Sequence, residues 1–188
     1  GVVYSGGEMP LEGLNWVHID AGLVATAWRE KIGGGGPGWI ALDAAIDLAR
    51  SNGARVLLPI PTRAAPRNED TWSARVEDTV RRTSDRVDRY EIASHVSVPP
   101  DRYLALYESG AWAAYQGYHK AAVGGPGADI SSGLVFSLME RCSDRSLPLS
   151  FVSWEVTAET GEEAEDSFGR VEGMLDRIGF KDRPSAMV

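Results

Sequence analysis

Short β-rich runs alternate with helical patterns along the whole chain, and this alternation limits the fold more than any other feature. The strand-like runs lie at 14–20, 55–60, 87–94, 121–126, 149–156 and 183–188. The helical patterns, which carry apolar residues at helical spacing, lie at 41–50, 69–84, 100–118, 134–141 and 162–178. Repeated βα units of this kind form a parallel sheet covered by helices, so we expect a fold of the α/β class.

The number of strands predicts a (β/α)8 barrel of the TIM type that is incomplete. Six strands are recognisable, or seven if residues 2–4 are counted, whereas such a barrel has eight strands and about 250 residues. An open doubly wound sheet is the competing fold, but no glycine-rich phosphate turn opens a first helix. The glycine run at 33–38 has no strand before it, and we interpret it as a loop. We therefore expect one partial barrel domain over residues 1–188.

The composition excludes several functional classes. A formal net charge of -8 and a pI near 4.9 argue against a nucleic-acid partner, which would need clustered Lys and Arg. No apolar run approaches the ~20 residues that span a bilayer, so we expect no membrane partner. No signal-peptide leader is visible either, and the compartment stays unknown. Cys142 is the only cysteine, which excludes an internal disulfide, and its helical spacing favours a buried position.

Five strand motifs follow one another in a recognisable order. They are Trp16-Val-His-Ile-Asp20, Tyr90-Glu-Ile-Ala-Ser-His-Val96, Ala122-Val-Gly-Gly-Pro126, Leu149-Ser-Phe-Val-Ser-Trp154 and Pro184-Ser-Ala-Met-Val188. In this order they resemble the strands of glycoside hydrolase family 39, the β-xylosidase-like members of a large clan of retaining-glycosidase barrels. The resemblance covers nearly the whole chain. It implies a carbohydrate-active barrel of the O-glycosyl hydrolase type, with a small-molecule or oligosaccharide ligand.

The chain departs from the family pattern where the chemistry should occur. Retaining glycosidases use two carboxyl groups about 5–5.5 Å apart, an acid/base and a nucleophile. The resemblance puts His95 at the acid/base position, His18 at a strand-two Arg position and Glu155 at a sixth-strand His position. The nucleophile's position would lie beyond Val188. We therefore expect impaired hydrolysis of glycosidic bonds, and the sequence leaves open whether the chain is an enzyme.

The resemblance also assigns roles to individual residues. His95 and Glu155 stand at the catalytic positions, and Asp20, Ser94 and Trp154 stand where the substrate would be contacted. Asp20, at a strand tip, is equally suited to holding a loop.

Two alternative functions remain open. Alternation along the strands places His18, His95 and Glu155 on the inward faces of the second, fourth and sixth strands. Two histidines and one carboxylate are the ligands of a His₂Glu zinc site or of a facial iron site, so a divalent metal, zinc or iron, is the one cofactor that the sequence suggests. Hydrogen-bonded pocket histidines are an equally good interpretation. The other alternative is a non-catalytic sugar-binding module.

Several conspicuous residues have simpler interpretations. Trp28, Trp39 and Trp72 are predicted to be core anchors rather than sugar platforms, and Glu91 to be a buried structural carboxylate. His119 precedes a strand, at the end of a barrel opposite the active mouth, and should contact solvent. An incomplete barrel leaves strand edges unpaired, so self-association through these edges is the expected protein partnership.

Overall fold

The computed structural model describes residues 2–4, 15–30, 34–62, 65, 68–155, 161–180, 182 and 184–187. The strands in this part of the chain are β1 (Val2–Tyr4), β2 (Trp16–Ile19), β3 (Arg55–Pro61), β4 (Arg89–Ser94), β5 (Val123–Asp129), β6 (Phe151–Glu155) and β7 (Ser185–Met187). The helices are α1 (Ala21–Ala27), α2 (Pro37–Ser51), α3 (Glu69–Thr83), α4 (Pro100–Gly117), α5 (Leu134–Arg145) and α6 (Gly161–Ile178). A short 3₁₀ helix, η2 (Ile130–Ser132), follows β5.

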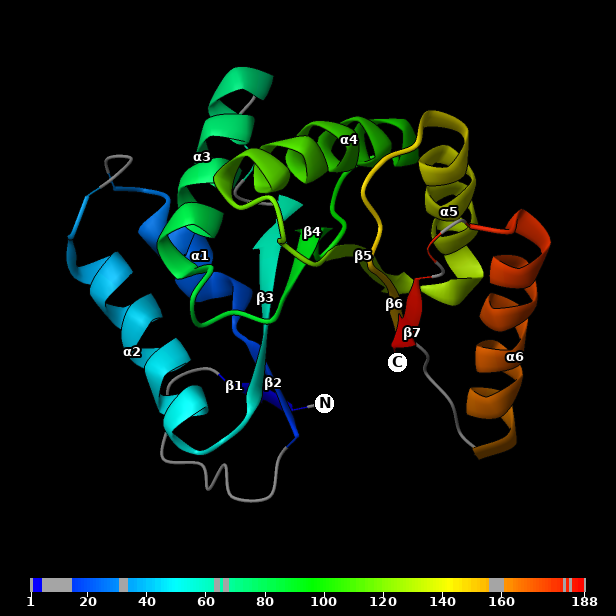
Figure 1. Cartoon of the computed structure of the whole chain (residues 1–188), viewed down its shortest axis with the longest axis horizontal. Helices are drawn as coiled ribbons and strands as arrows, with labels where there is room; N and C mark the ends of the chain where they lie inside the picture. The colour runs from blue at the N-terminus through cyan, green and yellow to red at the C-terminus, as the bar shows by residue number, and fades with distance from the viewer. Residues whose placement is uncertain are drawn as a thin grey trace.

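The strands form one parallel sheet whose spatial order is the chain order, from β1 to β7. The helices follow the outside of this curved sheet as an arc, from α2 through α3 and α4 to α5 and α6, with β1 and β7 at the two ends (Figure 1). No ladder joins β7 to β1 within the described residues, so the described sheet is an open arc. This arrangement confirms the predicted incomplete (β/α) barrel.

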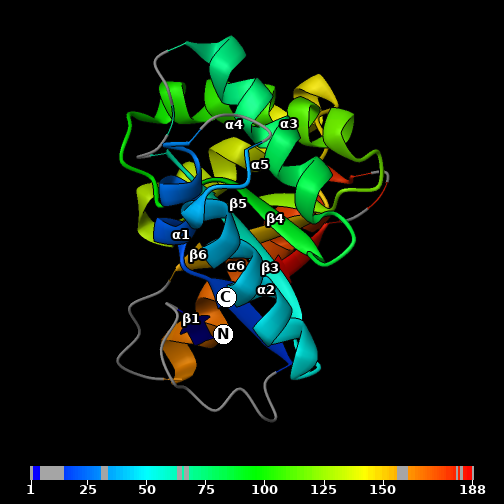
Figure 2. The ribbon, with the colours of Figure 1, turned by 90° about the vertical axis from the view of Figure 1, so that its left-hand side faces the viewer.

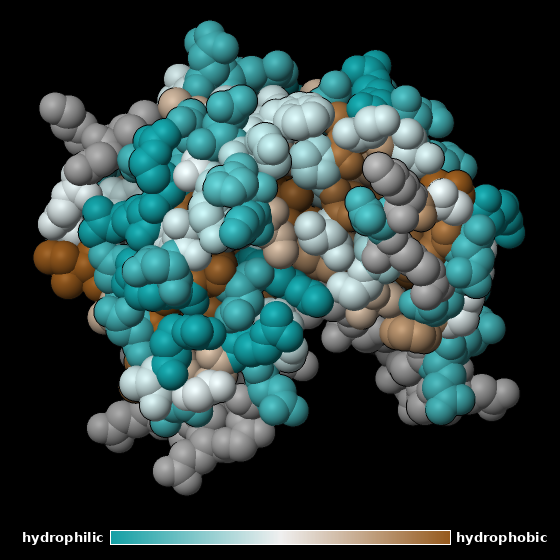
Figure 3. Space-filling model, in the orientation of Figure 1, coloured by the Kyte–Doolittle hydropathy of each residue, from teal (hydrophilic) through white to brown (hydrophobic). Residues whose placement is uncertain are grey.

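The hydrophobic core lies between the sheet and the helices. Val17 and Ile19 of β2 are fully buried on the helix-facing side, whereas His18 between them faces the inside of the arc and is partly exposed. Figure 2 shows α3 and α4 lying over β4 and β5 in this outer layer. In the space-filling view the inside of the arc corresponds to a notch between the sides formed by α2 and α6 (Figure 3).

The three tryptophans at loop and helix positions belong to this core, as predicted. Trp28 and Trp72 meet edge to face with their ring centroids 5.4 Å apart, and Trp39 is fully buried in α2. The indole nitrogen of Trp28 donates a hydrogen bond to Thr79 Oγ1 at 2.8 Å, which satisfies its buried polar group. None of the three rings is available to stack on a sugar.

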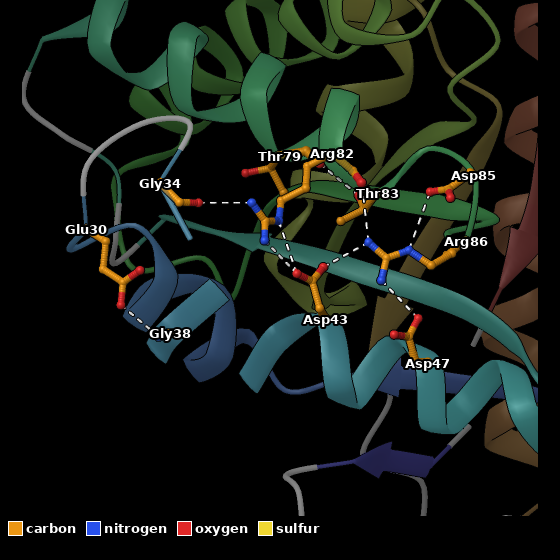
Figure 4. Close-up of polar contacts among 10 residues, drawn as sticks. All are labelled: Glu30, Gly34, Gly38, Asp43, Asp47, Thr79, Arg82, Thr83, Asp85 and Arg86. Atoms are coloured by element: carbon orange, nitrogen blue, oxygen red, sulfur yellow. Dashed lines mark hydrogen bonds and ion pairs between the residues drawn. The ribbon is translucent and has the colours of Figure 1, made fainter. Parts of the chain in front are cut away.

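An ion-pair network joins α2 to α3 on the outside of the arc (Figure 4). Asp43 accepts hydrogen bonds from Arg82 at 2.7 Å and from Arg86 at 2.8 Å, and Arg86 also reaches Asp47 at 2.9 Å. Arg82 donates a further bond to the carbonyl of Gly34 at 3.0 Å. The network therefore fixes the crossing of the two helices and the backbone just before α2.

Two strands bulge at their carboxyl ends. The β3–β4 register shifts so that Ala93, with φ 57°, is left unpaired, and the β5–β6 register shifts around Gly127, with φ 56°. His95 just beyond β4 also has a positive φ of 50°. Strict alternation of inward and outward side chains therefore ends before His95. We predicted an inward direction for His95 by counting residues along β4, and the bulge at Ala93 makes that count invalid.

The structure also bears on the predictions made for Cys142, His119, the glycine run and membrane-spanning segments. Cys142 is buried and His119 is exposed, as expected. In the glycine run, residue 33 lies outside the described residues, and Gly36 is the N-cap of α2 with Pro37 as its first residue. Among the described helices, none combines the length and apolar character needed to cross a membrane.

Candidate functional site

Side chains from β2, β4 and β6 meet inside the arc in layers. At the amino ends of the strands, the guanidinium of Arg89 lies over the ring of Trp16 at 4.8 Å and over that of Phe151 at 5.2 Å. Arg55 covers the same Trp16 ring at 4.2 Å. TIM barrels fill their interior with layers contributed by alternate strands, and this cation–π layer is the first of them.

The next layer consists of His18, Glu91 and Ser153, and we call it the Glu91 layer. In the backbone ladders His18 of β2 pairs with Leu57 of β3, and Leu57 pairs with Arg89 of β4. Because the strands are tilted, the His18 side chain instead lies near Glu91, two residues further along β4. Ser153 Oγ donates a hydrogen bond to Glu91 Oε1 at 2.6 Å, and His18 Nε2 lies 3.8 Å from Glu91 Oε2. Glu91 thus stands between the second and sixth strands.

Burial sets the protonation of the Glu91 layer. The Glu91 carboxyl is 4% exposed, and this burial raises its pKa to about 7 although the Ser153 hydrogen bond acts in the opposite direction. Burial, and next the nearby His95, lower the pKa of His18 to about 4. The layer therefore holds an imidazole that stays neutral to lower pH than usual, beside a carboxyl group that keeps its proton to higher pH than usual. The buried position of Glu91 agrees with its predicted structural role.

A cleft of about 550 Å³ opens above this layer, at the carboxyl ends of β4, β5 and β6. We call it the mouth cleft. Its polar lining is His95, Asp129, Ser132 and Glu155, and its apolar lining comes from the β4–α4 loop, the end of β5 and the start of α5. Active sites of TIM barrels form at this end of the strands, so the mouth cleft is the candidate functional site.

The two carboxylates of the mouth cleft lie on adjacent strands. Asp129 and Glu155 are register partners across the β5–β6 ladder, where neighbouring strands are about 4.8 Å apart. Hydrogen bonds from Ser131, including its backbone N–H at 2.7 Å, hold the pKa of Asp129 below its ordinary value. Neither Asp129 nor Ser132 was identified from the sequence. The available signal was their position, because Asp129 is the last residue of β5 and Ser132 lies in the 3₁₀ turn that follows it.

His95 and Glu155, the two predicted catalytic residues, line this one cleft. The ring of His95 stacks on that of His18, with centroids 6.4 Å apart and an angle of 11° between the planes. The carbonyl of His95 accepts a hydrogen bond from Thr62 Oγ1 at 2.8 Å, which anchors the residue just beyond β4. The imidazole therefore lies on the cleft wall, with the Glu91 layer beneath it.

The predicted substrate-contacting residues lie elsewhere. Asp20 caps α1, where its Oδ1 accepts the N–H of Gly22 at 2.6 Å, so it holds the start of a helix, whereas the alternative interpretation had it holding a loop. Ser94 is fully buried. Trp154 corrects our prediction of a sugar contact, because its side chain points outward to α6, is 2% exposed and donates to Ser167 Oγ at 3.2 Å.

The predicted metal site is also corrected. In the part of the chain that the structure describes, no group of three His, Cys, Asp or Glu side chains could hold a metal ion. The physical reason is that His18 belongs to the Glu91 layer, whereas Glu155 and His95 line the cleft above it. The two imidazole rings lie nearly parallel, with their centroids 6.4 Å apart.

Comparisons with known proteins find similarity in structure only. No protein-family model matches the chain, and no curated protein matches its sequence. A glucosidase from Croceicoccus marinus has a TM-score of 0.74 at 20% identity, over 91% of this chain and 44% of its own. A thermostable mutant of a xylanase from Cellvibrio japonicus has a TM-score of 0.70 at 10% identity, over 98% of this chain and 66% of its own. A psychrophilic glycoside hydrolase family 10 endo-β-1,4-xylanase has a TM-score of 0.64 at 15% identity, over 86% and 63%.

These likenesses show the fold. The chain has the fold of an incomplete (β/α) TIM barrel, and it spans between 44% and 66% of the length of the three similar structures. At identities of 20% or less the comparison does not extend to individual site residues.

Proposed function

We propose that the mouth cleft binds a carbohydrate, and that the chain is a carbohydrate-active barrel of the glycoside hydrolase family 39 type with impaired hydrolysis. The observation that carries the proposal is the position of the cleft, which opens at the carboxyl ends of β4 to β6 in a glycoside-hydrolase-like fold. The order of the five strand motifs supports family 39 within that group.

The lining of the cleft suits a sugar. Carboxylate oxygens of Asp129 and Glu155 can accept hydrogen bonds from sugar hydroxyls, and the imidazole of His95 can donate and accept. The Ser132 hydroxyl donates its proton to the Asp129 carbonyl at 2.7 Å and can serve a sugar only as an acceptor. The apolar lining suits the C–H faces of a pyranose ring. Because the similar structures are a glucosidase and xylanases, we infer that gluco- or xylo-oligosaccharides are the ligand class.

The same lining explains why hydrolysis should be impaired. An imidazole can act as a general acid, so His95 would be the proton donor and Glu155 the carboxylate partner of any residual reaction. Double displacement needs two carboxyl groups about 5–5.5 Å apart on the two sides of the scissile bond. Asp129 and Glu155 instead lie side by side on neighbouring strands. Because an imidazole replaces the acid/base carboxyl at position 95, we expect binding rather than turnover.

Calorimetric titration with cello- and xylo-oligosaccharides tests the binding. The parent chain should bind one of the two series, and Glu155→Gln should weaken this binding by about tenfold because it removes a charged acceptor. Glu140→Gln on the outer face of α5 is a matched control and should bind like the parent. Absence of binding by the parent, or equal affinity of parent and Glu155→Gln, would contradict the proposal.

Turnover of aryl β-glucosides and β-xylosides tests the impairment. We expect no rate above background for the parent chain, since removal of one member of a catalytic unit removes most of the effect of the whole unit. A robust rate that disappears in His95→Ala would show instead that the imidazole replaces the acid/base carboxyl.

A further inference from the structure

Glu91 is the buried acidic group beneath the mouth cleft. Among the described residues it is the only Asp, Glu, Lys or Arg in the buried class. A carboxyl group in this position costs free energy unless its contacts compensate for lost hydration. Its contacts therefore indicate what the side chain does.

One carboxyl oxygen of Glu91 holds the β5 side of the cleft. Oε1 accepts the hydroxyl of Ser153 at 2.6 Å, and that hydroxyl oxygen accepts the backbone N–H of Gly127 at 3.2 Å. Gly127 lines the cleft and packs directly on the carboxyl, because a Cβ added there would lie 2.7 Å from Oε1. The bulge of β5, after which Ala128 and Asp129 enter the cleft, is thus fixed from below.

The other carboxyl oxygen faces the opposite wall. Oε2 lies 3.8 Å from Nε2 of His18, which has no hydrogen-bond partner among the described residues, and the His18 ring supports the ring of His95 by parallel stacking. Through His18 and Ser153, a single side chain on β4 therefore reaches both His95 and Gly127.

We propose that Glu91 is a positioning residue of the mouth cleft, which fixes the β5 bulge at Gly127 through Ser153 and the imidazole of His95 through His18. As a statement about ligand affinity this rests on the proposed function, because the cleft must bind the sugar. As a statement about the shape of the cleft it stands without a ligand. Glu91 acts through its neighbours and does not touch the sugar.

Paired substitutions separate positioning from bulk stability. Glu91→Gln keeps the shape and an oxygen that accepts the Ser153 hydroxyl, so the backbone amide resonances of Gly127 and Ala128 should stay near their parent positions and sugar affinity should stay within about twofold. Glu91→Ala removes the acceptor, so these resonances should shift and affinity should fall by at least about tenfold. Glu140→Ala on α5 is the matched control and should leave both measurements unchanged.

A second route covers failure of Glu91→Ala to fold. Ser153→Ala retains the carboxyl and removes only the hydroxyl that joins it to Gly127, so it should shift the Gly127 amide resonance and weaken sugar binding by a few-fold. We expect Glu91→Gln to retain sugar affinity and the Gly127 resonance position, and either alanine variant to lose affinity and shift that resonance.

The outcomes distinguish this proposal from the proposed function. If the parent binds no sugar, the proposed function fails, and the Gly127 resonances in the ligand-free variants still decide the positioning role. If the parent binds sugar and Glu91→Ala or Ser153→Ala binds equally well with an unmoved Gly127 resonance, the positioning role is overturned. Equal loss of affinity in Glu91→Gln and Glu91→Ala would overturn it as well. Under the proposal, Glu91→Gln keeps the side-chain shape and the acceptor oxygen, and these should be sufficient to hold the cleft in place.

Discussion

Glu91 and His18 face each other inside the arc with opposite responses to pH. The pKa of Glu91 is raised by burial from 4.5 to about 7, so the folded protein binds more protons than the unfolded chain between these values. The pKa of His18 is lowered by burial from 6.5 to about 4, so here the unfolded chain binds more protons. Linkage then makes Glu91 favour stability at low pH and His18 favour it at high pH.

Between pH 4.5 and 6.5 the contributions of Glu91 and His18 to the pH dependence of the free energy of unfolding should nearly cancel. Substitution of one group should therefore reveal the contribution of the other. In Glu91→Gln the remaining His18 should make the free energy of unfolding fall, relative to the parent, as pH decreases from 6.5 toward 4. In His18→Gln the remaining Glu91 should make it fall as pH rises from 4.5 to 7. Each slope has an upper limit of ~1.4 kcal/mol per pH unit. Urea unfolding across this range measures both, and slopes of the same sign in the two variants would contradict the assignment.

Sequence reasoning located some site residues and misplaced others for identifiable reasons. His95 and Glu155 reach the cleft because strand order determines which ends share the barrel mouth. Counting along strands failed at Ala93, since a bulge adds a residue that no periodicity reveals. Trp154 was assigned to the cleft by resemblance, although alternation along β6 places it opposite Ser153 and against α6. Tilt across strands, which joins His18 to Glu91, exists only in the assembled sheet.

At the scale of single elements, the ion-pair network between α2 and α3 should contribute measurably to stability. Burial alone would raise the pKa of Asp43, but hydrogen bonds from Arg82 and Arg86 outweigh it and lower the pKa. Arg86→Ala should therefore reduce the free energy of unfolding by about 1–2 kcal/mol, because it removes charge-assisted bonds to the carboxylates of Asp43, Asp47 and Asp85.

Arg81, in the last turn of α3, provides the control for Arg86, which lies in the turn just after this helix. The Arg81 side chain is 59% exposed against 23% for Arg86, and it pairs with Glu77 one turn earlier on α3. Arg81→Ala should change the free energy of unfolding by about 0.5 kcal/mol or less. Urea unfolding of the two variants at neutral pH makes the comparison, and equal losses would show that the network does not join the helices energetically.

The β5 bulge should tolerate no side chain at Gly127. Gly127→Ala places a Cβ 2.7 Å from Glu91 Oε1 and also strains a backbone with φ 56°. Gly133 has a φ of 72° and open space around its Cα, so Gly133→Ala measures the backbone strain alone, about 1 kcal/mol. Gly127→Ala should reduce the free energy of unfolding clearly more than Gly133→Ala does, as measured by thermal or urea unfolding.

A double substitution identifies the cause at Gly127. Glu91→Ala removes the atoms that a Cβ at position 127 would meet, so Gly127→Ala should cost less in that background than in the parent. Additive losses would mean that the packing of Gly127 on the carboxyl is not the source of the effect.

At the scale of the whole molecule, the fold was predictable because it is built from local units. Each βα unit shows its own periodicity in sequence, and right-handed connections between neighbouring parallel strands leave few arrangements for a series of such units. The sequence of strands from β1 to β7 follows directly. The layers inside the arc could not be predicted in the same way, since they depend on strand tilt and on the two bulges.

Within the described residues β7 pairs with β6 on one side only, and we propose that this chain self-associates through the other edge of β7. Ser185 donates its N–H to Ser150 of the β6 side at 3.1 Å, so alternation along a parallel strand directs the N–H of Ala186 to the outer edge. Ala186→Pro removes that outward donor without removing a β6–β7 bond, and it should weaken association by at least about tenfold. Ala186→Thr keeps the donor and is the matched control. Sedimentation equilibrium over a wide concentration range measures the association constant, and a strictly monomeric parent, or equal association of both variants, would contradict pairing through this edge.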